Sequence, residues 1–360
     1  PIVGRMISYP LKGSTVDSAC AATSFATGKP ADLYQVSVDS EGKPVQTLFE
    51  AARAKGFRVG LVSDCRITHA TPAPFAAHVP NRHSEAEIAE QLVSSNFNVL
   101  FSGGRKFFLP KEQGGVQPDG KNLLDSARLR GFSVAQTKDE LIKATSQKAE
   151  KVLGVFHNTY LPFAWEKDAA TLPTLPEMTA AALSLLSVSD NGFLLMVEAG
   201  KMDVANHSHD GMCLIDAMQE LENTLKILTD YVKCQSDTIL VVVSDHATGG
   251  LNMTEQFDGD TFRSAATSTY FLAQTLKNRR DQTGTLLKST FPQLSFSDQD
   301  INRIITIEDQ EDFAMELGSI VYRQLGLCFF PPDWQQKMDK THGHTSEDLF
   351  IHAMGSHQSL

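Results

Sequence analysis

The sequence predicts an α/β fold with a central, mainly parallel sheet that is covered by helices on both faces. Strand-like segments alternate with helical segments along most of the 360 residues. The strand-like segments are continuous apolar runs rich in Val, Leu and Phe, which is typical of parallel strands buried on both faces. A chain of this length can also bury a large core. In sheets of this kind, ligands bind beyond the carboxyl ends of the strands.

The individual elements follow this alternation. An amphipathic stretch at 45–55 precedes the first predicted strand, and Ser84 followed by Glu87 has the pattern of a capping box that begins another helix. A long helical pattern covers 214–232. The predicted strands are 57–64, 98–102, 152–157, 193–198, 238–245 and 348–353.

Two stretches interrupt the alternation. Residues 105–121 are rich in Gly, Lys, Pro and Gln, which predicts a surface loop. Residues 253–335 are more polar and more mixed, and they end in a helical pattern at about 309–325. We therefore expect a single α/β domain over 1–360, with 253–335 as an insertion within it.

Composition excludes some classes of protein. The 32 basic and 43 acidic residues give a net charge of −11, which argues against nucleic acid as a partner. No apolar run approaches the roughly 20 residues that span a membrane. The five cysteines are widely spaced, and their odd number leaves at least one outside any set of intrachain disulfides. No signal peptide is visible, although Pro1 is not a natural start and a leader could have been removed.

The first candidate site is the stretch around Ser18. Ser18 begins a run of small residues, and Gly28 with Pro30 has the pattern of a helix end. Ser18 is therefore expected near a helix N-terminus, where backbone N–H groups favour an anion and the hydroxyl could attack a phosphate. The plainer alternative is a surface helix capped by Asp17 or Ser18. The G-x-S-x-G elbow is absent, so an activating group must come from elsewhere.

Potential metal ligands follow several predicted strands. Carboxylate mixed with imidazole suits Zn²⁺, and carboxylate with hydroxyl suits Mg²⁺. Each group alone is more typical of a turn, a cap or a core histidine. Their shared position at strand ends, where one site could collect them, favours a metal centre. The candidates are Glu198, Asp203, His207, Asp245, His246 and His344. His209 and His342 are interpreted as solvated or supporting residues.

The loop after the strand at 57–64 adds a cation. Arg82 could offer a planar fork to two phosphate oxygens. The alternative role for this arginine is a surface salt bridge.

Taken in order, these motifs resemble those of the alkaline phosphatase family, over roughly residues 10–250 and again over 338–355. The similarity is least clear in the middle of 253–335. The matching motifs are Val16-Asp17-Ser18-Ala19, His69-Ala70-Thr71-Pro72, Ala77-His78-Val79 with Arg82, Val197-Glu198-Ala199-Gly200 with Asp203 and His207, Ser244-Asp245-His246, and His344-Thr345.

The resemblance implies an enzyme that hydrolyses phosphate monoesters through a phosphoserine intermediate at a centre of two zinc ions and one magnesium ion. Ser18 would be the nucleophile, and Arg82 would hold the non-bridging phosphate oxygens. One zinc would be held by Asp203, His207 and His344, the second by Asp245 and His246, and the magnesium in part by Thr71 and Glu198. The full set of candidate metal ligands is Asp17, Ser18, Thr71, Glu198, Asp203, His207, Asp245, His246 and His344, with His69 beside them.

The family also implies a homodimer, a crown-like role for the insertion, and a periplasmic, secreted or cell-surface location. His69 stands where many bacterial members have Asp, and a softer ligand there would let Zn²⁺ or Co²⁺ compete with Mg²⁺.

Two departures from the family pattern leave alternatives open. Family members carry a metal-binding Asp in an Asp-Gly motif on their first strand, and this chain is expected to begin downstream of that strand and to stop soon after the strand that follows His344. One alternative is therefore an inactive fragment that binds metal or phosphate. Another is a phosphodiesterase or sulfatase of the same superfamily. The C/S-x-P-x-R motif of sulfatases is absent around Ser18, and diesterases usually have Thr as nucleophile and no equivalent of Arg82.

Overall fold

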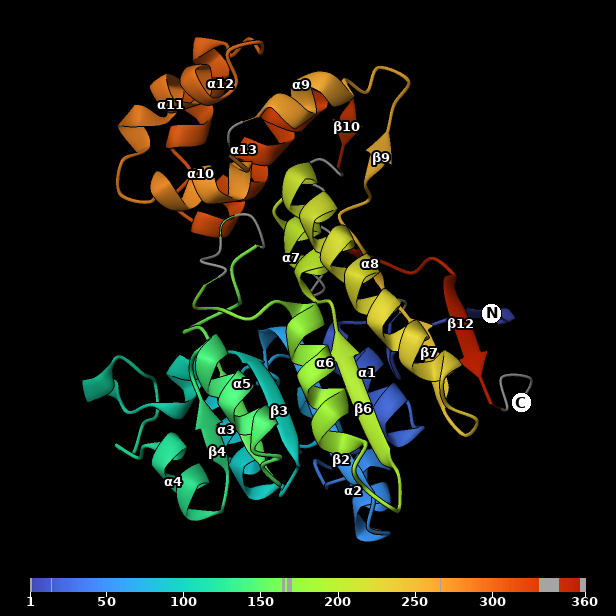
Figure 1. Cartoon of the computed structure of the whole chain (residues 1–360). Coiled ribbons are helices and arrows are strands. Elements are labelled where there is room, and N and C mark those ends of the chain that lie inside the picture. Colours follow the sequence, from blue (N-terminus) through green and yellow to red (C-terminus); the bar gives the residue numbers. More distant parts are fainter. Residues whose placement is uncertain are drawn as a thin grey trace. The chain divides into compact units, whose positions relative to one another are not determined.

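The computed structural model describes residues 2–13, 15–163, 166, 170–265, 267–329 and 343–356 (Figure 1). The chain divides into two compact units. The first unit comprises Pro1–Gly200, Gln219–His246 and Ser346–Leu360, and the second comprises Lys201–Met218 and Ala247–Thr345.

A five-stranded sheet forms the centre of the first unit. Its strands lie in the order β4-β5-β3-β2-β6, and every neighbouring pair is parallel. This confirms the predicted α/β fold with a mainly parallel sheet. The strands are β2 (Arg58–Arg66), β3 (Val99–Gly103), β4 (Ser133–Ala135), β5 (Val152–Val155) and β6 (Phe193–Glu198).

Helices cover both faces of this sheet, because alternate strand residues point to opposite sides. Leu61 of β2 belongs to a core shared with the helices α1 to α4, whereas its neighbour Val62 belongs to a second core shared with α5 and α6. Figure 1 shows the helices on either side of the strands. The helices are α1 (Ser18–Thr27), α2 (Leu48–Ala54), α3 (Glu85–Ser94), α4 (Leu123–Leu129), α5 (Lys138–Ser146) and α6 (Leu175–Leu186).

Strand β6 differs from the other strands in its exposure. The residues of β3 and β5 are buried throughout, whereas all six residues of β6 are half-buried. Among the described residues, β6 has β2 as its single neighbouring strand. Its side chains nevertheless pack on both cores, with Leu194 and Met196 on one face and Leu195 and Val197 on the other. Strand β6 therefore has the apolar pattern of a central strand in the position of an edge strand.

A second, antiparallel sheet completes the first unit. It has the order β1-β12-β7 and is built from β1 (Ile2–Met6), β12 (Leu349–Gly355) and β7 (Ile239–Val243). The strand predicted at 238–245 is β7, and its partner in the described chain is β12, to which it runs antiparallel. Strand β1 was not predicted. The long helix predicted at 214–232 is α8 (Gly211–Lys233).

Two local predictions in this unit need correction. The capping box at Ser84 is absent: this residue precedes α3, but its side chain makes no capping hydrogen bond and its backbone is not extended (φ −74°, ψ 45°). Capping boxes are formed instead by Thr47, Thr137 and Thr174. The predicted loop at 105–121 contains two 3-10 helices, η2 (Arg105–Phe108) and η3 (Lys111–Gln113), and it buries Phe108 completely.

The second unit is mainly helical and has its own core around Phe313, Leu317 and Tyr322. The helix predicted at 309–325 is α13. The longer elements are α7 (Lys201–His207), α9 (Gly259–Ser264), α10 (Thr269–Thr275), α11 (Thr283–Thr290), α12 (Asp298–Ile305) and α13 (Gln310–Gln324). The short strands are β8 (Ala247–Thr248), β9 (Asn252–Met253), β10 (Leu327–Cys328) and β11 (His344–Thr345).

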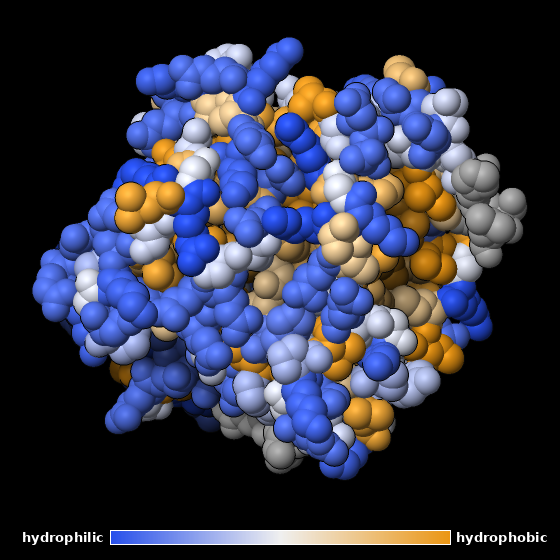
Figure 2. All heavy atoms as spheres, turned by 90° about the horizontal axis from the view of Figure 1, so that it is seen from below, coloured by the Kyte–Doolittle hydropathy of each residue, from blue (hydrophilic) through white to orange (hydrophobic). Residues whose placement is uncertain are grey.

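The surface is mainly hydrophilic, as expected for a sequence that is rich in charged residues. Hydrophilic residues cover most of the face in Figure 2, and hydrophobic residues form separate patches on it. Within the described part of the chain, no helix is both long and apolar enough to cross a membrane.

Candidate active site

The helix predicted around Ser18 is present. Helix α1 begins at Ser18, and the Asp17 carboxylate caps it by accepting a hydrogen bond from the Cys20 N–H at 3.1 Å. Gly28 ends the helix in the left-handed conformation (φ 70°), as its position in the sequence predicted. Only 3% of Ser18 is exposed, because small residues such as Ala19 and Ala22 pack closely around the start of the helix. The hydroxyl is therefore fixed at a buried helix N-terminus.

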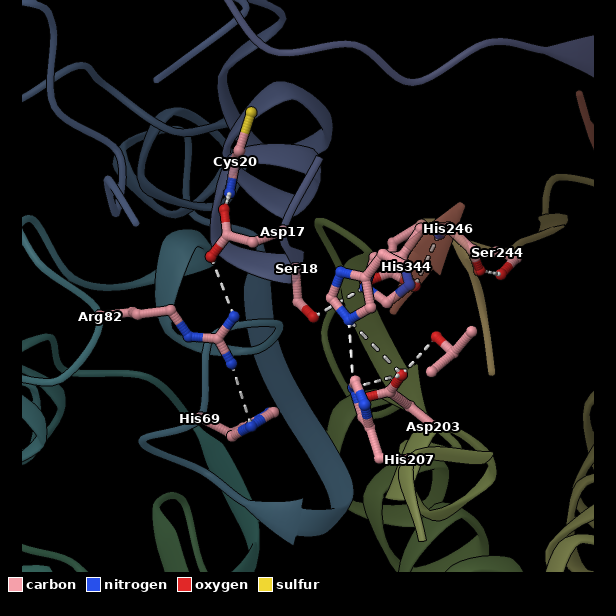
Figure 3. A network of polar contacts seen from close by, with 12 residues as sticks. Asp17, Ser18, Cys20, His69, Arg82, Asp203, His207, Ser244, His246 and His344 are labelled. Atoms are coloured by element: carbon pink, nitrogen blue, oxygen red, sulfur yellow. Dashed lines mark hydrogen bonds and ion pairs between the residues drawn. The ribbon is translucent and has the colours of Figure 1, made fainter. Parts of the chain in front are cut away.

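Ser18 contacts His246, and the geometry of this contact identifies its chemistry. The Ser18 Oγ lies 3.0 Å from His246 Nε2 (Figure 3), and the Asp245 Oδ2 lies 3.1 Å from the same nitrogen. In a Ser-His-Asp relay, the carboxylate would bind the other ring nitrogen, Nδ1, so that Nε2 serves the serine alone. Here a hydroxyl, a carboxylate and an imidazole nitrogen converge on one point.

This convergence fits a metal site. Hydroxyl, carboxylate and imidazole are all ligands of Zn²⁺, and bonds of 2.0–2.1 Å in a tetrahedron separate ligand atoms by about 3.3 Å. The Asp245 carboxylate is also oriented for this role, because its other oxygen accepts the His246 backbone N–H at 3.1 Å. Ser18, Asp245 and His246 thus have the chemistry for one zinc ion, and the two separations from His246 Nε2, 3.0 and 3.1 Å, are of the expected size.

Arg82 is held beside the start of α1 by Asp17. The guanidinium Nη1 donates to Asp17 Oδ2 at 2.9 Å, and Nη2 lies 3.3 Å from His69 Nε2. The second Asp17 oxygen accepts the N–H of Tyr34 at 3.1 Å as well as that of Cys20. Three donors of the chain therefore bind the Asp17 carboxylate. These contacts give Asp17 a structural role, and its role as a metal ligand stays a prediction.

A cluster of hydroxyl and carboxylate side chains surrounds Glu198, which ends β6. Ser63 of β2 is the register partner of Glu198 and donates its hydroxyl to Glu198 Oε2. Burial raises the pKa of Glu198 to about 8; hydrogen bonds from Ser63 and Thr71 lower it, and the charges of Asp64 and Asp245 raise it further. Hydroxyls mixed with crowded carboxylates suit a hard cation such as Mg²⁺, whose charge would offset theirs.

A third group lies in the second unit. Within the described part of the chain, Asp203, His207 and His344 are the one set of three His, Cys, Asp or Glu residues whose ligand atoms all lie within 4.8 Å of one another. The His207 and His344 Nε2 atoms are 3.1 Å apart, and they lie 3.4 Å and 3.9 Å from Asp203 Oδ1 (Figure 3). We call this set the triad.

The local folds explain how the triad forms. Asp203 and His207 stand one turn apart on α7, so they share a face of the helix. His344 lies on β11, where it pairs with Thr248 of β8. The Thr248 hydroxyl in turn donates to Asp203 Oδ1 at 2.6 Å. Two imidazoles and a carboxylate at these spacings fit a zinc site with three protein ligands.

The whole chain, residues 1–360, matches the family model described as alkaline phosphatase. The chain belongs to the alkaline phosphatase family. This confirms the resemblance that the sequence motifs indicated, and it agrees with the α/β fold described above.

Relatives and solved structures point the same way. The membrane-bound alkaline phosphatase of Bombyx mori is 32% identical over 289 residues, covering 68% of this chain and 52% of the relative. Alkaline phosphatase 3 of Bacillus subtilis is 32% identical over 260 residues, covering 70% and 54%. The chain thus spans about half the length of these curated relatives. The crystal structure of Thermus thermophilus alkaline phosphatase superposes with a TM-score of 0.86 at 25% identity, covering 98% of this chain and 77% of that one.

Several supporting residues of this family member were not predicted. Ser63 and Asp64 lie near the carboxyl end of β2, and Asp64 Oδ1 accepts the Gly200 N–H at 2.7 Å, just beyond Glu198. Thr248 was missed as the partner of Asp203. The strand-end rule would have found Ser63 and Asp64, because β2 and β6 are neighbours in the sheet.

Two further histidines were considered from the sequence. His209 is completely buried, stacks on Phe329 at 4.7 Å and contacts Ser319 Oγ at 2.5 Å through Nδ1. Burial lowers the pKa of His209 to about 3, so this ring is neutral. It is a core residue and not a solvated one. His342 lies outside the described residues.

Proposed function

We propose that this chain hydrolyses phosphate monoesters to an alcohol and inorganic phosphate, with Ser18 as the nucleophile. The observation that supports this most directly is the contact of Ser18 Oγ and Asp245 Oδ2 with one nitrogen, His246 Nε2. A serine in such a position can be activated by a cation and needs no relay base. Family membership supports phosphate monoesters as the substrate class.

The proposal assigns a cation to each of the three groups. Ser18, Asp245 and His246 would hold one zinc, the triad a second zinc, and Glu198 with Thr71 a magnesium. When bound, such ions supply Lewis acidity, lower the pKa of a coordinated hydroxyl or water, and stabilise negative charge on oxygen. His69 contacts Arg82 in this structure, which supports a role in phosphate binding rather than at the magnesium.

The residues of the chain bind and orient the phosphate. The N-terminus of α1 favours an anion beside Ser18, and the Arg82 guanidinium can bind two non-bridging oxygens. Asp17 fixes that guanidinium through the 2.9 Å ion pair. Transfer of the phosphoryl group to Ser18 Oγ breaks the bond to the leaving alcohol, and water then releases phosphate. Two in-line displacements give net retention at phosphorus.

Further parts of the proposal rest on family membership. We propose a homodimer, an exported location that is periplasmic, secreted or at the cell surface, and a single domain into which 253–335 is inserted. The composition of the second unit, most of which is Ala247–Thr345, supports the insertion.

The test is an assay of the 360-residue chain with p-nitrophenyl phosphate in the presence of Zn²⁺ and Mg²⁺. We expect turnover, and mass spectrometry of acid-quenched reactions should find phosphate on the peptide that contains Ser18. Ser18→Ala should lower turnover by at least about 1,000-fold. Ser24→Ala, on the same helix, is the matched control and should retain activity. Turnover that survives in Ser18→Ala would refute the nucleophile, and a chain that binds phosphate without turnover would support the inactive alternative.

A further inference from the structure

A short strap, residues 34–37, connects the helix that begins at the proposed nucleophile with the segment that carries Arg82. On the side of α1, the Ser37 N–H donates to Thr23 Oγ1 at 3.0 Å. On the other side, the Arg82 N–H donates to the Tyr34 carbonyl at 2.8 Å. The position of the strap therefore helps to set where Arg82 lies relative to the start of α1.

The strap holds two residues in an unfavourable backbone conformation. Tyr34 (φ 69°) and Ser37 (φ 44°) both lie in the left-handed region, which residues other than Gly rarely adopt. Such strain persists only where surrounding contacts hold it, and it is most frequent at functional sites. Val36 lies between the two, is completely buried, and pairs with Val79 through two backbone hydrogen bonds of 3.0 Å. The strap is therefore a strained segment that its neighbours keep in place.

His78 ties the strap to α2. Its Nδ1 lies 2.8 Å from the Ser37 carbonyl oxygen, and its Nε2 lies 2.9 Å from Glu50 Oε1. Carbonyl and carboxylate oxygens are acceptors, so both ring nitrogens carry a proton and the ring is an imidazolium. Gln91 of α3 fixes the backbone of His78, because its amide accepts the His78 N–H at 2.7 Å and donates to the His78 carbonyl at 3.0 Å. One protonated side chain thus joins two segments of the chain.

The surroundings of the ring favour this protonated state. Burial lowers the pKa of His78, but the hydrogen bonds to Glu50 and Ser37 and the charge of Glu50 outweigh burial and raise the pKa above its usual value. The hydrogen bond from His78 in turn lowers the pKa of Glu50. Among the described residues, Glu50 is the one charged group that acts on the ring, whereas α3 presents the uncharged Gln91, which also contacts Glu87 at 3.4 Å. A neutral ring has a single N–H and can keep only one of the two contacts.

We propose that His78 is a positioning residue, whose imidazolium holds the strap against α2 and thereby fixes Arg82 for binding phosphate. This inference rests on the proposed role of Arg82. When the ring loses its proton, one contact is lost, the strap can shift, and phosphate binds less tightly. Phosphate is also the product of the proposed reaction, so its release becomes easier as pH rises.

The test compares inhibition by inorganic phosphate in the metal-loaded wild type, His78→Asn and His78→Gln. Asn can replace the Nδ1 donor and Gln the Nε2 donor, so each variant keeps at most one contact and has no proton to lose. Both variants should fold, because the Ser37 carbonyl also accepts the Val45 N–H at 2.9 Å.

The expected result is a pH-dependent ratio of inhibition constants between variant and wild type. At about pH 6 the ratio should be about 3 to 10, because a misplaced group binds more weakly, and at about pH 9 it should approach 1, because the wild type then also has one contact. A ratio cancels the ionisation of phosphate and of every group that the proteins share. His352→Asn, an exposed change on β12, is the control and should give a ratio of about 1 throughout.

A second measurement needs neither activity nor a variant. NMR of isotope-labelled histidine in the whole chain, assigned through the backbone, should show both ring nitrogens of His78 protonated to a higher pH than in a short unstructured peptide. A His78 ring that titrates as in the peptide would overturn the proposal, as would a ratio that does not change with pH. The proposed function fails separately, through an inhibition constant that Arg82→Ala leaves unchanged. This inference fails alone where Arg82→Ala raises the constant and the two His78 variants do not.

Discussion

The candidate ligands of the two units are held in place by different means. In the first unit, side chains at the site have partners within the chain: Asp17 holds Arg82, and Ser63 holds Glu198. Asp17 precedes α1, Glu198 ends β6, Ser63 lies near the end of β2, and Arg82 lies in the segment before α3. The triad of the second unit lies on a short helix and a two-residue strand, and its His207 and His344 Nε2 atoms face each other. Contacts within the chain therefore hold the first group, whereas the spacing of the triad fits the cation that we propose for it.

After the loss of Ser18, the next largest effect is expected from breaking the triad. His207→Ala removes one of three ligands, so the chain should lose one bound zinc, measured by metal analysis. Turnover of p-nitrophenyl phosphate should fall at least about 100-fold, because a metal ion stabilises transition-state charge by several kcal/mol. The exposed His352 of β12 is the matched control, and His352→Ala should change neither quantity. Full zinc content in His207→Ala would show that the triad is not a metal site.

Substitutions of Arg82 test the site of the first unit, where Asp17 holds the Arg82 side chain in place. Arg82→Ala removes charged hydrogen bonds to the phosphate oxygens, so the inhibition constant of inorganic phosphate should rise about 10- to 100-fold. Arg82→Lys keeps the charge but loses the planar fork, and its inhibition constant should fall between those of the wild type and the Ala variant. Identical constants in all three proteins would exclude phosphate binding by this residue.

The raised pKa of Glu198 predicts a pH dependence of stability in the metal-free chain. The folded state binds the Glu198 proton up to a pH of about 8, whereas the unfolded state releases it near 4.5. Between these values the folded state binds more protons, so this group lowers the free energy of unfolding as pH rises, by at most about 1.4 kcal/mol per pH unit. Glu198→Gln should remove this contribution, and urea titrations at several pH values measure it. A slope that is the same in both proteins would contradict the shifted pKa.

Thr248 should have the smallest effect, because it orients a ligand without binding the metal. Thr248→Val removes the hydrogen bond to Asp203, and the zinc affinity of the triad should fall about 10-fold or less. Competition with a zinc chelator measures this change. Thr254→Val, whose hydroxyl bonds to the Gly326 carbonyl, is the control. A loss as large as that of His207→Ala would mean that Thr248 is itself a ligand.

The fold class and α1 could be predicted because their signals are local. Continuous apolar runs mark buried strands, and Asp17 and Gly28 mark the two ends of a helix whatever surrounds them. The partner of β7 could not be predicted, because the same apolar run suits a parallel or an antiparallel neighbour. The capping box at Ser84 did not form, and the next residue, Glu85, instead binds Arg66 and Thr68. A local sequence motif carries no information on such tertiary contacts.

Some residues of the site could be predicted from the sequence and others could not, again because only part of the signal is local. Acids and histidines at strand ends are few enough to attract notice, and the family resemblance supplied their grouping. Serine and threonine occur throughout the sequence, so residue type alone does not mark Ser63 and Thr248 as parts of the site. The strand register does, because it pairs Ser63 with Glu198 and Thr248 with His344. The role of Asp17 needed the position of Arg82, 65 residues away in the chain.

The exposure of β6 has a consequence for handling the protein in solution. Its five residues Phe193–Val197 are all apolar, and the strand contains neither Pro nor Lys, the residues with which natural edge strands resist aggregation. In the described part of the chain no strand pairs with the outer edge of β6, and an unpaired edge beside such a sequence is a template for another extended chain. We therefore expect self-association of concentrated samples to begin at β6.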